Sequence, residues 1–189
     1  MKLVGLKISN FRSYKSLVHL RIDNFTAIVG RNDVGKSTLL EALDVFFNHK
    51  NIKLDQSDPC VHNEGKVIEI SCVFEDLPAT LTIDAKSETT LAAEWLLNGQ
   101  GQLEIVKRFD CRPKTPKEEV FACAVTSANG QLADLLKLKN AGLKERAQAV
   151  GADLSEVDQR SNAALRRAIR TAVGEVSSAE RGRLAAAAT

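Results

Sequence analysis

The sequence lacks long apolar runs, has few aromatic residues and carries almost no net charge. Aromatic residues make up 5% of the 189, and the formal net charge is +2. No apolar run approaches the ~18 residues needed to span a bilayer. Between Lys2 and Lys7 lie four uncharged residues, too few for a signal peptide. We therefore expect a cytoplasmic protein without a membrane segment, large enough for one domain or one lobe of a larger protein.

The cysteines and histidines lack the spacing of a metal site. No CxxC pair occurs, and only His62 stands close to a cysteine, two residues after Cys60. This pattern favours reduced thiols over zinc ligands in Cys60, Cys72, Cys111 and Cys123.

Strand-like patterns fill the first two thirds of the chain. Residues 3–8 and 17–22 alternate, as half-buried strands do, and residues 66–75 repeat that pattern. Residues 25–29 are nearly all apolar, which predicts a strand covered on both faces. Further strands are expected at 81–83, at 120–125, and at 91–97 and 102–109, which flank the turn signal Asn98-Gly99-Gln100-Gly101. The middle of the chain is therefore predicted to be antiparallel.

Helical spacing appears after residue 35 and again near the C-terminus. Apolar residues at helical intervals predict an amphipathic helix over 36–48 and another that begins at Leu132. The last predicted helix carries the apolar stripe Leu165, Ile169 and Val173, with Ser161 or Asn162 as its N-cap. We expect an α/β chain of α+β character: a lobe over 1–130, a helical segment over 131–183 and a low-complexity tail over 184–189.

One motif carries the chemistry. It runs Gly30-Arg31-Asn32-Asp33-Val34-Gly35-Lys36-Ser37 and matches the G-x4-G-K-[ST] phosphate-binding loop at every position. Successive backbone N–H groups and the start of the following helix cradle a polyanion. Lys36 is expected to reach the β- and γ-phosphates, Ser37 to ligate Mg²⁺, and Thr38 to contact the α-phosphate. The motif predicts a site for Mg-ATP.

The carboxylate that would order the metal and activate water is not evident. Glu75 and Asp76 follow an apolar stretch, but its alternation predicts a half-exposed antiparallel strand, so we interpret them as a solvated strand end. Asp84 is a weaker candidate. No catalytic residue is assigned.

Segments 6–13 and 28–43 carry a family resemblance. The run Leu6 to Ser13, followed by the phosphate loop and Leu39-Leu-Glu41-Ala-Leu43, resembles the SMC/RecF-like branch of ABC ATPases. Within that branch, the Arg-Asn-Asp-Val-Gly loop and residues 67–78 look most like the overcoming-lysogenization-defect (OLD) family of bacterial antiviral systems. The resemblance implies a P-loop NTPase lobe with antiparallel strands around its core, followed by helices.

The resemblance also implies roles for the segment before the motif. Asn10, Phe11, Arg12 and Ser13 would lie near the nucleotide, with Arg12 facing the phosphates. From the residues alone, Phe11 would fill a corner of the core and Arg12 would be solvated.

Other family features are absent from the 189 residues. The second-lobe signature segment, the strand ending Asp-Glu, the switch histidine and a TOPRIM nuclease domain do not occur, and Leu154-Ser155-Glu156 lacks the glycines of a signature. We expect the chain to be the N-terminal piece of a longer protein, a hypothesis that a native stop codon after Thr189 would exclude. Hydrolysis would require a homodimer around the nucleotide, and the isolated chain would bind ATP weakly. The γ-phosphate-sensing glutamine stays open among Gln56, Gln100, Gln102 and Gln131.

Nucleic acid is a candidate partner. Arg166, Arg167 and Arg170 fall off the apolar stripe, so they would contact DNA phosphates or form a solvated helix face. A second group, Lys107, Arg108, Arg112, Lys114 and Lys117, is nearly balanced by four acids between 104 and 119.

Three functions stay open. The first is the ATPase module of an OLD-type system that acts with a nuclease in DNA repair or antiphage defence. The second is the head of an SMC- or RecF-like DNA-binding protein. The third is a regulatory module that senses ATP without hydrolysing it.

Overall fold

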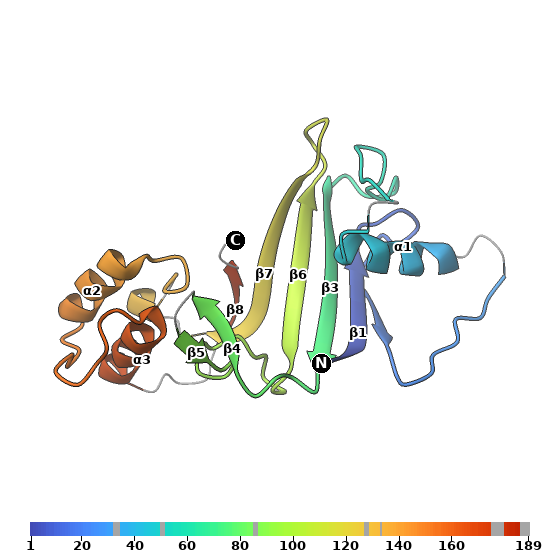
Figure 1. The fold of residues 1–189 in the computed structure, drawn as a ribbon. Helices are drawn as coiled ribbons and strands as arrows, with labels where there is room; N and C mark the ends of the chain where they lie inside the picture. Colours follow the sequence, from blue (N-terminus) through green and yellow to red (C-terminus); the bar gives the residue numbers. More distant parts are fainter. Residues whose placement is uncertain are drawn as a thin grey trace. The chain divides into compact units, whose positions relative to one another are not determined.

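The computed structural model describes residues 1–31, 35–49, 52–84, 87–126, 129–132, 134–174 and 180–185. Within them, six strands form one sheet in the order β2-β1-β3-β6-β7-β8 (Figure 1). The strands are β1 (Lys2–Ser9), β2 (Val18–Arg21), β3 (Val67–Glu75), β6 (Leu103–Asp110), β7 (Lys117–Thr126) and β8 (Glu180–Ala185). A separate antiparallel pair consists of β4 (Leu81–Asp84) and β5 (Ser87–Thr89). The mixed α/β prediction is confirmed.

The chain divides into two compact units. One contains Met1–Asp76 with Glu104–Phe121, and the other contains Leu77–Leu103 with Ala122–Thr189. The first unit therefore holds the sequence motif, and the second holds the helices of the last third. Strand β7 runs from one unit into the other.

Strand β1 lies between β2 and β3 in the first unit. It pairs antiparallel with β2, with Leu6 opposite Leu20, and antiparallel with β3, with Leu6 opposite Cys72. Strand β3 lies between β1 and β6, and its residues from Ile70 to Phe74 are all buried. The antiparallel prediction for 66–75 is confirmed, but the prediction of a half-exposed strand is wrong, because both of its faces are covered.

Helix α1 (Lys36–Phe46) confirms the helix predicted after the motif. Leu39, Ala42, Val45 and Phe46 are buried, and the Phe46 ring lies 6.3 Å from the Phe74 ring of β3. Leu40 of this helix and Phe47, the C-cap residue that follows it, are less buried, although the Phe47 ring also lies 6.4 Å from the Phe74 ring. Leu40 is 59% exposed and Phe47 is 50% exposed.

The strand predicted at 25–29 does not form. Residues 22–31 are not in a helix or strand, Phe25 is 87% exposed and Val29 is 92% exposed. An apolar strand becomes buried only when neighbouring strands supply hydrogen bonds and layers cover its faces. In the described part of the chain no strand pairs with this segment.

The second unit departs from prediction in its turns and linkers. Residues 91–95 form turns rather than a strand, and Leu97 forms an isolated antiparallel bridge with Leu103. Asn98 makes the predicted turn, its Oδ1 accepting from the N–H groups of Gln100 and Gln102. The helix predicted from Leu132 is wrong: η1 (Gly130–Leu132) is one 3-10 turn, and turns follow it. The tail predicted at 184–189 is also wrong in part, because Leu184 and Ala185 belong to β8; residues 186–189 lie outside the described residues.

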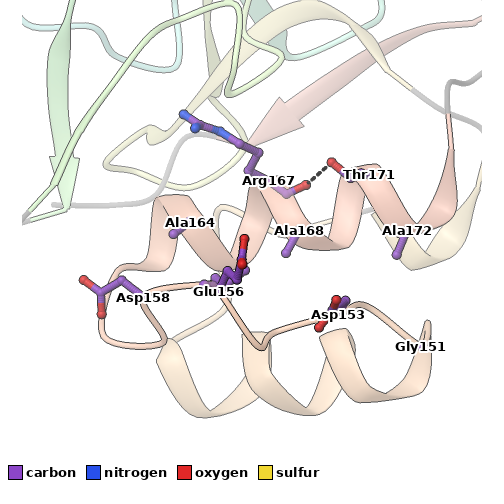
Figure 2. A pocket seen from close by; sticks show the side chains of 10 residues that line it. Gly151, Asp153, Glu156, Asp158, Ala164, Arg167, Ala168, Thr171 and Ala172 are labelled. Atoms are coloured by element: carbon purple, nitrogen blue, oxygen red, sulfur yellow. Dashed lines mark hydrogen bonds between the residues drawn. The ribbon is translucent and has the colours of Figure 1, made fainter.

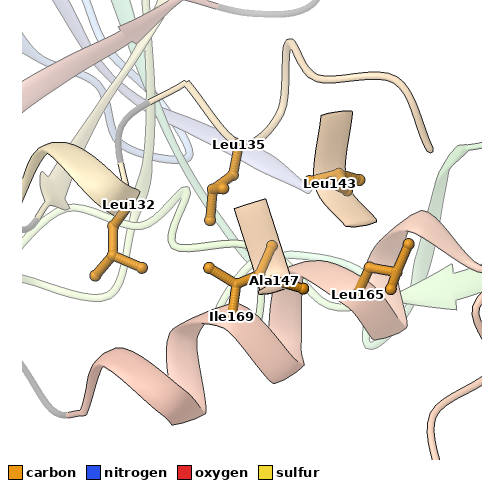
Figure 3. Close-up of a cluster of buried hydrophobic side chains, with 6 residues drawn as sticks. All are labelled: Leu132, Leu135, Leu143, Ala147, Leu165 and Ile169. Atoms are coloured by element: carbon orange, nitrogen blue, oxygen red, sulfur yellow. The ribbon is translucent and has the colours of Figure 1, made fainter. Parts of the chain in front are cut away.

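Two helices pack together in this unit. They are α2 (Asn140–Ala149) and α3 (Asn162–Val173), and the predicted N-cap of α3 is confirmed because Ser161 Oγ accepts from Ala164 N–H at 3.2 Å. Figure 3 shows their shared core, in which the side chains converge from α2, α3 and the segment before them. Its buried members are Leu132, Leu135, Leu143, Ala147, Leu165 and Ile169.

Candidate nucleotide-binding site

The start of α1 has the features of an anion site. Gly35 is its N-cap and adopts φ +86°, a left-handed conformation that favours glycine. No side chain caps this end, and no acidic residue lies in the first turn. The first N–H groups of a helix have no partner within the helix, so they attract a phosphate. Asn32, Asp33 and Val34 lie outside the described residues.

Lys36 connects the two ends of the motif. Its Nζ donates to the Gly30 carbonyl at 2.7 Å and also to the Arg31 carbonyl. The ammonium group therefore lies against the N-terminal end of the loop, although the Lys36 backbone begins α1. Ser37 is exposed and Thr38 is buried in the same helical turn. Gly30, Arg31 and Gly35 to Thr38 are thus brought together around one loop.

The residues from Asn10 to Tyr14, which we term the 10–14 loop, pack against Gly35. A Cβ placed on Gly35 would lie 2.6 Å from Ser13 Oγ and 3.1 Å from the Tyr14 ring. The Tyr14 hydroxyl donates to the Gly35 carbonyl at 3.1 Å. The predicted neighbour Ser13 therefore lies at the phosphate loop, and Tyr14, which the sequence analysis did not single out, lies there with it.

Arg12 is held by two carboxylates. Its Nε donates to Asp58 Oδ1 at 2.9 Å, and its Nη1 forms an ion pair with Glu41 of α1. The side chain is 34% exposed, so the alternative of a freely solvated Arg12 is wrong. The other half of that alternative is confirmed, because Phe11 is completely buried.

Polar contacts with residues 58–67 fix the 10–14 loop. Asn10 Nδ2 donates to the carbonyls of Gly65 and Val67 at 2.7 and 2.9 Å, and Arg12 N–H donates to Asp58 O at 2.7 Å. Asn10 and Arg12 both have positive φ, 56° and 48°. Such strained residues persist only where their surroundings hold them, and they cluster at functional sites. Asp58 was missed because nothing in the local sequence pairs it with a residue 46 positions earlier.

The candidate carboxylates lie away from the loop. Lys2 pairs with Glu75 at one end of β1, whereas Ser9 pairs with Glu69 at the other end, next to the 10–14 loop. At roughly 3.3 Å per residue, these ends lie about 20 Å apart. Glu75 and Asp76 are exposed there, as their interpretation as a strand end predicts.

The candidate glutamines lie in different segments and do not form one site. Gln56 Nε2 donates to the Arg112 carbonyl at 2.7 Å, Gln100 and Gln102 belong to the Asn98 turn, and Gln131 lies in η1. Asp84 ends β4 in the second unit. None of these contacts assigns a γ-phosphate sensor.

Two of the three arginines considered for DNA are paired with the buried carboxylate of Glu94. Arg166 is 1% exposed and donates to both oxygens of Glu94, Nε to Oε2 at 2.8 Å and Nη2 to Oε1 at 2.9 Å. Arg170 Nη1 donates to Glu94 Oε2 at 3.1 Å, and its guanidinium lies 5.2 Å from the Trp95 ring centroid. Both predicted roles are therefore wrong for Arg166 and Arg170, whereas Arg167 is exposed. Helical spacing within α3 could not predict the partner Glu94, which lies 72 residues before Arg166.

The second basic group is divided between buried and exposed positions. Lys107 is buried and pairs with Glu118 at 2.7 Å, while its Nζ lies 5.7 Å from the Phe46 ring centroid. Arg112 pairs with Asp110, and its hydrogen bonds lower the pKa of that carboxyl to about 2. Lys107 is therefore unavailable to a nucleic acid, whereas Arg112, Lys114 and Lys117 are exposed.

A separate cavity lies in the helical part. It has a volume of about 500 Å³ and opens between α3 and residues 151–158 (Figure 2). Small residues of α3 line one side, and acidic residues of the 151–158 segment line the other. The lining includes Ala164, Ala168, Ala172, Asp153, Glu156 and Asp158.

Within the described residues, no group of three His, Cys, Asp or Glu side chains is placed to hold a metal ion. Burial raises the pKa of Cys72 to about 12, and likewise that of Cys111 to about 11, so both remain protonated thiols at neutral pH. No described helix is long and apolar enough to cross a membrane.

A family model of the AAA ATPase domain matches residues 1–181. The chain belongs to this family. This AAA ATPase domain is also 38% identical over 73 residues to "Endonuclease GajA" of Bacillus cereus (strain VD045), which covers 37% of the chain and 12% of that protein. It is 43% identical over 44 residues to "Structural maintenance of chromosomes protein 1" of Saccharomyces cerevisiae, which covers 22% of the chain and 4% of that protein. The similarity to OLD- and SMC-like ATPases expected from the motifs is confirmed.

Proposed function

We propose that the AAA ATPase domain binds Mg-ATP at the start of α1, as the ATP-binding part of a larger OLD- or SMC-like ATPase. The observation that carries the proposal is the convergence of three elements on the phosphate loop: the uncapped helix start at Gly35, the Lys36 ammonium at Gly30, and the 10–14 loop against Gly35. The donors fit a triphosphate, because the first turn offers N–H groups and a lysine and contains no acid. Ser37, exposed in that turn, supplies a hydroxyl for Mg²⁺.

In this proposal Arg12 and Ser13 face the phosphates together with the motif residues Gly30 to Thr38. Ser13 already lies against Gly35. Arg12 would offer a phosphate oxygen its further N–H groups while it keeps Glu41 and Asp58, because a guanidinium carries five donors.

We also propose that the 189 residues alone hydrolyse little ATP. The two carboxylates tied to the 10–14 loop, Glu41 and Asp58, are both paired with Arg12 and therefore poorly suited to activate water. The exposed segment 25–29 needs a neighbouring strand, which we assign to a second lobe of the same protein. Turnover would then require that lobe and a homodimer around the nucleotide.

The relative named as an endonuclease supports action with a nuclease. We further propose, from the OLD-like motifs, that this action serves DNA repair or antiphage defence in the cytoplasm. The observation that Arg12 occupies both nearby acids favours a second candidate, a module that senses ATP without hydrolysing it. Turnover by the full-length protein would distinguish the two.

Calorimetric titration of the 189-residue chain with Mg-ATP tests the binding proposal. We expect saturable binding that Lys36→Ala weakens at least tenfold, while Lys53→Ala, at an exposed lysine outside the motif, leaves it unchanged. Equal binding by wild type and Lys36→Ala would contradict the proposed site. Turnover that is robust in the isolated chain and lost in Lys36→Ala would contradict the need for a second lobe.

A further inference from the structure

Tyr14 is rigidly placed against the peptide that begins α1. Phe11 N–H donates to Tyr14 O at 3.0 Å, and Tyr14 N–H donates to Phe11 O at 2.9 Å, so the two backbones close a small ring. Phe11 is completely buried and therefore anchors this ring to the core. Tyr14 itself is partly buried, with its hydroxyl 3.1 Å from the Gly35 carbonyl oxygen.

The hydrogen bond to Gly35 fixes the orientation of one peptide group. The Gly35 carbonyl also accepts from Leu39 N–H at 3.3 Å, so the tyrosine supplies a second donor to the first acceptor of the helix. In a trans peptide the C=O and the next N–H point in opposite directions. A carbonyl held by Tyr14 and Leu39 therefore directs the Lys36 N–H out of the helix start, where an anion would bind.

The tyrosine ring acts on the same residue through packing. Two ring carbons of Tyr14 would lie 3.1 Å from a Cβ on Gly35, so the ring covers the α-carbon. Gly35 has φ +86°, and glycine without such contacts populates many other conformations. Tyr14 therefore limits Gly35 to the conformation that the phosphate loop requires.

From these contacts we infer that Tyr14 is a positioning residue of the phosphate site, which orients the Lys36 N–H toward the phosphates without contacting the nucleotide. The inference rests on the proposed ATP site and adds a residue that the sequence motif does not contain. It also says which part of the ligand depends on Tyr14. The affinity for the di- or triphosphate chain depends on this residue, whereas the affinity for the nucleoside does not.

Calorimetric titrations of the 189-residue chain with Mg-ATP and with pyrophosphate test this inference. Tyr14→Phe removes only the hydroxyl and keeps the ring. Loss of one hydrogen bond that orients a binding group is expected to weaken both ligands about 3- to 10-fold. The Tm without ligand should change little. Ser16→Ala, which removes an exposed hydroxyl two residues away, should leave both affinities unchanged.

An NMR measurement separates positioning from a purely structural role. Addition of pyrophosphate should shift the Lys36 amide proton of wild type strongly and that of Tyr14→Phe less at saturation. Affinities and shifts equal to wild type in Tyr14→Phe would overturn the inference while leaving the proposed function intact. A lower affinity with an unchanged Lys36 shift would also overturn it. Absence of ATP and pyrophosphate binding in wild type would overturn the proposed function and, with it, the inference.

Discussion

Arg166 and Glu94 form a bidentate ion pair in which each side chain is 1% exposed. Their Nε–Oε2 and Nη2–Oε1 distances are 2.8 and 2.9 Å, and Thr89 Oγ1 donates to the same carboxylate at 3.0 Å. The contacts tie α3 to the residues after β5, all within the second unit. This pair is a structural feature of the helical part and is inaccessible to a nucleic acid.

Arg166→Ala should lower the free energy of unfolding by about 3–5 kcal/mol, because it leaves a buried carboxylate with fewer partners. Arg167→Ala is the matched control. Its side chain is exposed on the next position of α3, so its effect should stay within about 0.5 kcal/mol. Urea denaturation measures both. Equal effects of the two substitutions would contradict the buried pair.

Acid should weaken the second unit through Glu94. Burial raises the pKa of Glu94, but the hydrogen bond and charge of Arg166, with Arg170, outweigh it and hold the pKa below the ordinary 4.5. The unfolded state therefore binds a proton first as the pH falls, so the stabilisation is complete above about pH 4.5 and is lost toward the folded-state pKa.

Urea midpoints between pH 3 and 6 measure this dependence. Glu94→Gln should flatten the acid slope, although it lowers stability at neutral pH. Glu88→Gln, at an exposed position on β5, should retain the wild-type slope. A slope unchanged in Glu94→Gln would show that another group causes the acid sensitivity.

Local patterns predicted the elements that need only local chemistry. The motif gave the start of α1 at Lys36, and the Ser161 cap gave the start of α3, because caps and glycine positions act within a few residues. The long-range partners could not be predicted. Arg12 meets Asp58 across 46 residues, and its φ of 48° is imposed by those contacts rather than by its own preference.

The strand predicted at 25–29 failed for a related reason. Its apolar composition describes a buried environment, but composition does not say which segment supplies the neighbouring strand. Likewise Arg166 and Arg170 were expected to be exposed because helical spacing places charged residues off the apolar stripe. The face of α3 that packs against the protein also includes these two arginines, because Glu94 pairs with both of their charges.

Gly35→Ala should impair nucleotide binding more than it impairs folding. A left-handed conformation costs a non-glycine residue about 1–2 kcal/mol, and the new Cβ would also lie 2.6 Å from Ser13 Oγ. Gly101→Ala is a matched control, because Gly101 has φ +75° with no atom within 4 Å of its Cβ position. Chemical denaturation should show comparable backbone strain in both variants. ATP titration should show a loss of affinity only in Gly35→Ala. Normal ATP binding by Gly35→Ala would contradict the close approach of the 10–14 loop.

Substitution of Phe25 tests whether segment 25–29 awaits a partner. In the 189-residue chain Phe25 is 87% exposed, so Phe25→Ser should change the free energy of unfolding by no more than about 0.5 kcal/mol. Phe74→Ala, at a buried ring in β3, should cost about 3–5 kcal/mol. In a longer native protein that buries the segment, Phe25→Ser should also become destabilising, by about 1.5–3 kcal/mol. A large cost in the 189-residue chain would mean that the segment already packs there. A negligible cost in the longer protein would remove the argument that a neighbouring strand completes this lobe.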